Sequence, residues 1–120
     1  MICKDVIKEN YSLLLGDCLE RMKEIPDGSV DAIICDPPYG TVSCKWDSVI
    51  PFDPMWVELK RIIKPNGACV LFSSQPFTTN LIYSNMDCFK YSMVWKKSKC
   101  GSPLTAKYKP LINFDCILLG

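Results

Sequence analysis

The 120-residue chain contains no histidine, and none of its eight cysteines belongs to a Cys-x-x-Cys pair. Structural zinc sites usually take their ligands from closely spaced cysteines and from histidine, so we expect no metal site. A disulfide scaffold is the alternative for a short secreted chain. Three of the cysteines instead lie inside apolar runs, where a free thiol behaves as a small hydrophobic side chain. We therefore expect Cys35, Cys69 and Cys116 to fill the core.

Long apolar runs are also absent. None approaches the roughly 20 residues that a membrane-spanning helix needs. The first ten residues mix charged with apolar side chains and contain no signal-type apolar block. The composition, 48% hydrophobic with a net charge of +1, excludes the disordered class, which combines low hydrophobicity with high charge. These observations predict at most one compact domain, no membrane partner and a cytoplasmic location.

Short apolar runs alternate with segments of helical spacing, which is the pattern of an α/β layer protein. The run at 30–35 is almost continuously apolar, as is typical of a strand buried in a parallel sheet. Turn residues bound each of the other runs. The predicted strands are 11–15, 30–35, 68–73, 91–95 and 114–119.

Three helices are predicted between these strands. Asp17 stands three residues before Glu20, a capping-box spacing that indicates the start of a short helix. Asp53-Pro54 indicates the start of the second helix, with Asp as the cap and Pro at the first helical position. Pro65-Asn66-Gly67 indicates its end, and the third helix is predicted at 78–86.

Two acidic residues follow predicted strands, Asp17 after the first and Asp36 after the second. Ligands of open parallel sheets bind beyond the carboxyl ends of the strands, where loops converge. Both carboxylates could therefore face one crevice. For Asp17 a helix cap and a ligand contact are equally favoured, because one carboxylate can do both.

Asp36-Pro37-Pro38-Tyr39 is the most specific feature of the sequence. Two consecutive prolines fix two φ angles and push Asp36 and Pro37 toward extended geometry, which makes a stiff segment. It directs the Asp36 carboxylate, the Pro37 carbonyl oxygen and the Tyr39 ring to one place. Two acceptors beside an aromatic plane suit a flipped nucleobase with an amino group, and stacking of a base on such a ring contributes about 1–3 kcal/mol. An ordinary turn is the alternative, but the segment follows an apolar strand, which favours function.

The chain resembles a known family at these residues. Leu-Leu-Leu-Gly-Asp-Cys-Leu at 13–19 and Gly-Ser-Val-Asp-Ala-Ile-Ile-Cys-Asp-Pro-Pro-Tyr-Gly at 28–40 are similar to the N6-adenine and N4-cytosine DNA methyltransferases that place their catalytic region first. The similarity continues through 61–67, 94–97, 109–111 and 115–118. It implies a partial doubly wound, Rossmann-like methyltransferase sheet of about five strands with flanking helices. It also implies S-adenosylmethionine as the cofactor and DNA as the partner.

The resemblance assigns roles to single residues. Asp36, Pro37, Pro38 and Tyr39 would be catalytic, with Asp36 and Pro37 binding the target amine and Tyr39 stacking on the base. Asp17 and Asp36 would bind the cofactor, Asp17 at its adenosine end. Asp115 stands where the family commonly has Glu.

A lysine-rich stretch is expected to contact DNA. Residues 1–87 carry 8 basic and 12 acidic groups, whereas 88–114 carry six lysines and no acid. Charge alone is also compatible with a solvated loop. The resemblance places the stretch near the DNA side and favours contact with phosphates. The predicted DNA-binding residues are Lys96, Lys97, Lys99, Lys107 and Lys109.

Closely spaced glycines are missing. No two of the six glycines lie closer than 12 residues, so the chain has no Gly-x-Gly turn. The family needs a glycine-rich strand-to-helix turn at the methionine portion of its cofactor, and in this subgroup the turn follows the catalytic region and a target-recognition segment. We interpret residues 1–120 as the catalytic-region portion of a methyltransferase domain, lacking both. Such a portion should be incomplete or inactive alone, expose apolar strand edges, and require a missing half or a second polypeptide.

Adenine N6 is the preferred target, in site-specific methylation of the restriction-modification kind, because Asp at the first motif position is commoner in the family's adenine enzymes. The alternatives are methylation of cytosine N4, RNA or a protein amide, and a non-enzymatic nucleic-acid-binding remnant that uses the lysines alone. Methylation of cytosine C5 is disfavoured because none of the nine prolines precedes a cysteine.

Overall fold

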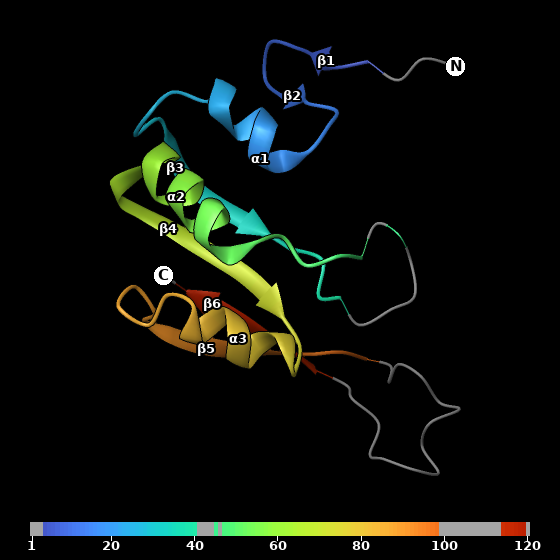
Figure 1. The fold of residues 1–120 in the computed structure, drawn as a ribbon, viewed down its shortest axis with the longest axis vertical. Coiled ribbons are helices and arrows are strands. Elements are labelled where there is room, and N and C mark those ends of the chain that lie inside the picture. Colours follow the sequence, from blue (N-terminus) through green and yellow to red (C-terminus); the bar gives the residue numbers. More distant parts are fainter. Residues whose placement is uncertain (1–3, 41–44, 46, 99–113, 120) are drawn as a thin grey trace.

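A four-stranded sheet forms the centre of the structure, a computed structural model that describes residues 4–40, 45, 47–98 and 114–119. Its strands are β3 (Val30–Cys35), β4 (Ile63–Ser73), β6 (Phe114–Leu119) and β5 (Tyr91–Lys96), in that spatial order (Figure 1). β3 and β4 are parallel, and β6 is antiparallel to β4 and to β5. The four strands match the predicted ones closely, apart from the longer β4.

The helices pack on one face of this sheet. They are α1 (Cys18–Arg21), the 3₁₀ helix η1 (Met22–Glu24), α2 (Phe52–Ile62) and α3 (Phe77–Tyr83), and Figure 1 shows α2 and α3 in front of the strands. The core joins Met55 of α2 and Leu81 of α3 to Leu71 of β4, and Leu19 of α1 packs against it. Alternation along β4 puts Ser73 on the same face, where the Thr78 hydroxyl donates to it at 2.9 Å. None of the described helices is long and apolar enough to cross a membrane.

The first predicted strand, 11–15, is wrong in length and in partner. Strand β2 covers Ser12–Leu13 alone and pairs antiparallel with β1 (Val6–Ile7), apart from the larger sheet. A local hairpin closes a short loop, which costs little chain entropy compared with joining a distant strand. Asp17 therefore follows a hairpin and not a strand of the main sheet.

Both predicted limits of the second helix are also wrong. Helix α2 begins at Phe52, so Asp53 lies inside its first turn, where a carboxylate is favourable beside the positive helix end. The helix ends at Ile62, and residues 65–67 lie within β4. Val30 is opposite Ile63 but Ala32 is opposite Ala68, so β4 bulges here and the turn residues occupy the bulge. The third helix ends three residues early, at Tyr83.

Strand β3 is not buried as the sequence predicts. It is an edge of the four-stranded sheet, and its Ile34 is 74% exposed. Cys35 is exposed and Cys69 is half-buried, so the expectation that Cys35 fills the core is wrong. Ile34 is exposed because no described helix covers its face of the sheet. Cys35 lies opposite Leu71 on the face that carries the helices, and it is exposed because β3 has no second neighbouring strand among those described. Cys116 lies in β6, whose side chains are outside the description.

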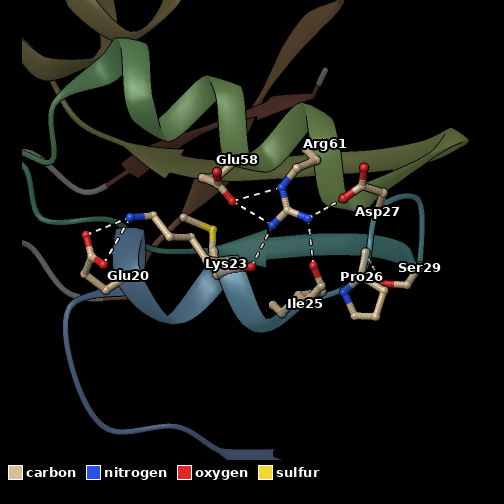
Figure 2. Close-up of polar contacts among 9 residues, drawn as sticks. Glu20, Lys23, Ile25, Pro26, Asp27, Ser29, Glu58 and Arg61 are labelled. Carbon is tan, nitrogen blue, oxygen red and sulfur yellow. Dashed lines mark hydrogen bonds and ion pairs between the residues drawn. The ribbon is translucent and has the colours of Figure 1, made fainter.

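Arg61 joins α2 to the turn that precedes β3 (Figure 2). Its guanidinium donates to the carbonyl oxygens of Met22 and Ile25, both at 2.8 Å. It also donates to the carboxylates of Glu58 at 2.7 Å and Asp27 at 2.6 Å, and these hydrogen bonds raise the pKa of Arg61. One cation therefore holds η1, the turn at 25–27 and α2 together, which fixes the position where β3 begins.

We expect Arg61→Ala to lower the melting temperature by several degrees, because two backbone carbonyls and two carboxylates lose their shared donor. Thermal denaturation followed by circular dichroism measures the change. Lys60→Ala is the control, since Lys60 is the exposed neighbour on the same helix. Equal melting temperatures for the two variants would contradict the role given to Arg61.

Candidate active site

The Asp36–Tyr39 segment begins directly after β3, at the carboxyl end of that strand. Asp36 is exposed, Pro37 is buried, and Pro38 and Tyr39 are half-buried. The buried ring of Pro37 anchors the segment to the protein, and the two fixed φ angles leave its neighbours little freedom. The carboxylate of Asp36 is therefore presented to solvent on a stiff support.

Tyr39 is held from three directions. Its hydroxyl donates to Asp36 Oδ1 at 2.5 Å, which orients that carboxylate. Its ring stacks on Phe77 of α3, with ring centroids 5.2 Å apart and planes inclined by 28°. Its backbone N–H donates at 3.1 Å to Oδ1 of Asp47, a residue only 8% exposed. The ring and the carboxylate thus form one unit, supported by α3 and by the loop before α2.

Phe77 and Asp47 were not predicted as parts of the site. Phe77 lies far from the motif in sequence, at the start of an apolar helix, and Asp47 lies eight residues after Tyr39 in a loop. A buried acid in a loop is unusual and is generally retained by hydrogen bonds. The burial of a single loop residue cannot be read from the sequence, so the sequence did not indicate that Asp47 belongs to the site.

Gly40 allows the chain to turn away from Tyr39. Its φ of +71° lies in the left-handed region, and a Cβ there would approach Cγ2 of Val49 to 2.8 Å. Gly28 also has a positive φ, +57°, but a Cβ at that position would meet nothing within 4 Å. The turn after the motif therefore needs glycine both for its backbone angle and for space.

We expect Gly40→Ala to destabilise the fold by more than Gly28→Ala, which should cost about 1 kcal/mol from the backbone angle alone. The additional loss comes from the contact with Val49. The denaturant midpoints of the two variants measure the difference. Val49→Ala, combined with Gly40→Ala, should recover most of it. Equal costs at the two glycines would contradict the predicted close contact.

Asp17 caps helix α1, as the spacing predicts. The N–H of Leu19 donates to Asp17 Oδ1 at 2.8 Å. Partial desolvation raises the pKa of the Cys35 thiol, and so do its electrostatic interactions with Cys18, the residue after Asp17, and with Asp36. Cys18 at the start of α1 is thus near enough to Cys35 at the end of β3 to affect it, although Asp17 does not follow a strand of the main sheet. A cofactor contact by Asp17 stays a prediction.

Two of the predicted DNA-binding lysines are described. Lys96 ends β5 and Lys97 follows it, and both are exposed. β5 runs in the same direction as β3 and β4, because β6 is antiparallel to both β4 and β5. The two lysines therefore lie at the same end of the sheet as Asp36, where β3, β4 and β5 have their carboxyl ends. Lys99, Lys107 and Lys109 lie outside the described residues.

A cavity of about 410 Å³ lies away from this end of the sheet, between α2, α3 and the first half of β4. Its lining is mainly apolar, includes Trp56, Leu81 and Phe89, and contains no residue of the Asp36–Tyr39 segment. Burial raises the pKa of Cys69, which also lines it, to about 11. The described residues contain no cluster of histidine, cysteine or acidic side chains able to hold a metal ion.

Comparison with curated proteins finds DNA methyltransferases. The chain is 28% identical to the type II methyltransferase M.HinfI of Haemophilus influenzae over 78% of its length and 34% of that protein. It is 27% identical to the type II methyltransferase M.BamHI of Bacillus amyloliquefaciens, covering 79% of this chain and 25% of the relative. It is 28% identical to the DNA adenine methyltransferase YhdJ of Escherichia coli K12, covering 78% and 35%. No protein-family model matches the chain.

Solved structures share the fold. The cytosine-N4-specific PvuII DNA methyltransferase matches with a TM-score of 0.66 and 16% identity, over 88% of this chain and 47% of that one. The complex of M1.HpyAVI with S-adenosylmethionine matches with a TM-score of 0.56 and 18% identity, over 84% and 47%. The sheet and its helices are thus part of a Rossmann-like methyltransferase fold. The chain is homologous to a segment of the N6-adenine and N4-cytosine DNA methyltransferases, and it spans about a third or less of the curated relatives' length.

Proposed function

We propose that this chain supplies the target-amine side of a DNA methyltransferase that transfers a methyl group from S-adenosylmethionine to the exocyclic amine of a flipped adenine. The observation that carries the proposal is the exposed Asp36 carboxylate, oriented by the Tyr39 hydroxyl at the carboxyl end of β3. Ligands of α/β sheets bind beyond the carboxyl ends of the strands. The curated relatives that the chain matches include the type II methyltransferase M.HinfI and the DNA adenine methyltransferase YhdJ.

The chemistry follows from what the target amine needs. Its lone pair is delocalised into the base and is a poor nucleophile in that form. If the amine donates its two N–H groups to the Asp36 carboxylate and the Pro37 carbonyl oxygen, the nitrogen moves toward tetrahedral geometry and the lone pair becomes available. Asp36 Oδ1 already accepts from Tyr39, which leaves Oδ2 for the amine. The stiff proline pair holds these acceptors in place and reduces the entropy lost on binding.

Tyr39 offers an aromatic plane for the base. Phe77 already packs on one side of the ring, so the two rings form a stacked pair that an unstacked base extends. The hydroxyl of Tyr39 lies beside the Asp36 carboxylate, which it orients. Stacking and hydrogen bonding are therefore available at the same point.

The residues present fit only part of an S-adenosylmethionine site. Asp36 is exposed, but the Asp17 carboxylate already accepts the N–H of Leu19 through one oxygen. The sequence contains no Gly-x-Gly turn for the methionine portion. When bound, the cofactor supplies the electrophilic methyl group. We propose that the remainder of its site comes from a further half of the enzyme, in the same or a second polypeptide.

We propose adenine N6 as the target in preference to cytosine N4, because Asp36 occupies the first position of the motif. The matched proteins include an adenine methyltransferase among the curated relatives and a cytosine-N4-specific enzyme among the solved structures. Lys96, at the same edge of the sheet as Asp36, is proposed to contact DNA phosphates. A cytoplasmic location stays a prediction.

Asp36→Ala should lower the rate of methyl transfer by at least about a hundredfold, because it removes the carboxylate that accepts a hydrogen bond from the target amine. Asp36→Asn should be nearly as inactive, since the amide replaces one acceptor oxygen by a donor. The measurement is transfer of radiolabelled methyl groups to DNA by the chain co-expressed with the unmatched part of a curated relative.

Asp87→Ala is the matched control, because Asp87 is an exposed acid distant from the segment in sequence. Affinity for DNA should change little in every variant. A non-enzymatic nucleic-acid-binding protein would bind DNA in a salt-dependent manner and show no transfer before or after the Asp36 changes. Full activity of Asp36→Ala would refute the role given to Asp36.

The isolated 120-residue chain should show no binding of S-adenosylmethionine at micromolar concentrations in calorimetric titration. The reason is the absence of a glycine-rich turn against which the methionine portion could pack. M.HinfI, titrated in parallel, is the positive control. Micromolar binding by the isolated chain would contradict the proposed division of the cofactor site.

A further inference from the structure

The cavity between α2, α3 and the first half of β4 has no part in the proposed function, because no residue of the Asp36–Tyr39 segment lines it. We call it the α2–α3 cavity. Its lining residues all lie between Trp56 and Phe89, so one continuous part of the chain builds its walls. Its volume of about 410 Å³ is typical of small-molecule sites, which are mostly apolar with a few polar groups.

A pair of hydrogen bonds fixes the wall that joins the two helices. The indole N–H of Trp56 in α2 donates to the Ser84 hydroxyl at 2.8 Å. That hydroxyl donates in turn to the carbonyl oxygen of Leu81 in α3 at 2.7 Å. The polar atom of the indole is therefore already paired, and the rest of the ring gives the cavity an apolar wall.

The interior of the α2–α3 cavity is apolar and uncharged. Its aliphatic residues come from α2, β4 and α3: Leu59, Ile63, Leu71, Leu81 and Ile82. Burial raises the pKa of Cys69 to about 11, so this thiol is neutral at pH 7. Aliphatic walls impose no directional contacts on a ligand. They suit a flexible hydrocarbon chain, and each methylene group that enters should tighten binding about fourfold.

The charged residues of the lining are all basic. Lys60 and Lys64 line the cavity, and no acidic residue does. Lys64 donates to Asp31 Oδ1 at 2.6 Å, so its charge already has a partner. Within the described part of the chain, Lys60 makes no ion pair, and the Asn85 side chain, which also lines the cavity, makes no hydrogen bond. One cation and one amide are thus available beside an apolar interior.

We propose that the α2–α3 cavity binds an amphiphilic monocarboxylate, a hydrocarbon chain that carries one carboxylate. The chain would lie between the two helices and β4, while the carboxylate pairs with the Lys60 ammonium and accepts from the Asn85 amide. A neutral apolar molecule would leave both groups unused. A phosphate monoester would bring more negative charge than one available lysine neutralises. The site shares no residue with the Asp36–Tyr39 segment, so the inference is independent of the proposed function.

Calorimetric titration of the 120-residue chain with octanoate and with decanoate tests the binding. We expect saturable one-to-one binding, and decanoate should bind about tenfold more tightly than octanoate because it buries two more methylene groups. Decanol, which has the same chain without the charge, should bind about threefold to fivefold more weakly than decanoate, the range expected of one exposed ion pair.

Alkylation of the cysteines locates the ligand without any substitution. Cys88 is half-buried and lines the cavity, whereas Cys18 is exposed on α1 and does not line it. Saturating decanoate should slow the reaction of Cys88 with iodoacetamide at least about threefold and leave that of Cys18 unchanged. Mass spectrometry of the digested protein resolves the two sites.

Paired variants test the two parts of the site. Cys88→Trp fills part of the cavity and should weaken decanoate binding at least about tenfold, whereas Cys18→Trp makes the same exchange outside it and should change nothing. Lys60→Ala should weaken binding of decanoate about threefold to fivefold but not that of decanol. Lys90→Ala, which removes an exposed lysine outside the lining, is its control. All four variants should keep the circular dichroism spectrum of the parent chain.

Several outcomes would overturn the proposal. The absence of saturable binding, or the uptake of several molecules per chain, would show that decanoate only adsorbs to exposed apolar side chains. Binding that survives Cys88→Trp and leaves Cys88 unprotected would place the ligand elsewhere. Equal affinities of the Lys60→Ala and Lys90→Ala variants for decanoate would contradict the carboxylate contact.

Discussion

The parallel pairing of β3 with β4 is the constraint on which the site depends. It fixes where β3 ends and therefore where the proline pair begins, and it places Leu71 opposite Cys35 under the helices. Arg61 sets the other end of the strand through the turn at 25–27. With both ends of β3 defined, Tyr39 meets Phe77 of α3, and its hydroxyl reaches Asp36. A shift of one residue in this register would turn every side chain of β3 to the opposite face.

The proposed methyl transfer draws on this chain for only part of what it requires. The chain contains an oriented carboxylate on a stiff segment, an aromatic ring beside it and Lys96 at the same end of the sheet. The sequence contains no glycine-rich turn, and the apolar cavity lies away from this end of the sheet. The same division appears in the packing, because the described helices cover one face and leave Ile34 and Trp95 exposed on the other.

Sequence reasoning succeeded where the signal is local. The strand at 30–35, the cap at Asp17 and the strand at 114–119 depend on residues close in the chain, and the structure confirms them. It failed where the outcome depends on which neighbours are available. Strand 11–15 pairs with β1 in a hairpin, and residues 65–67 form a bulge instead of a helix end. Cys35 was expected in the core because an apolar run does not reveal whether a strand lies at an edge.

The stiff Asp-Pro-Pro-Tyr segment, the apolar strand before it and the lack of a glycine-rich turn follow from covalent geometry and residue order, so they can be read from the amino-acid sequence. The folded structure was needed to show that Tyr39 stacks on Phe77 and orients Asp36, that Asp47 is buried beside the segment, and that no described helix covers one face of the sheet. Contacts between residues distant in the chain and the burial of a face depend on how the strands and helices assemble, which local patterns do not encode.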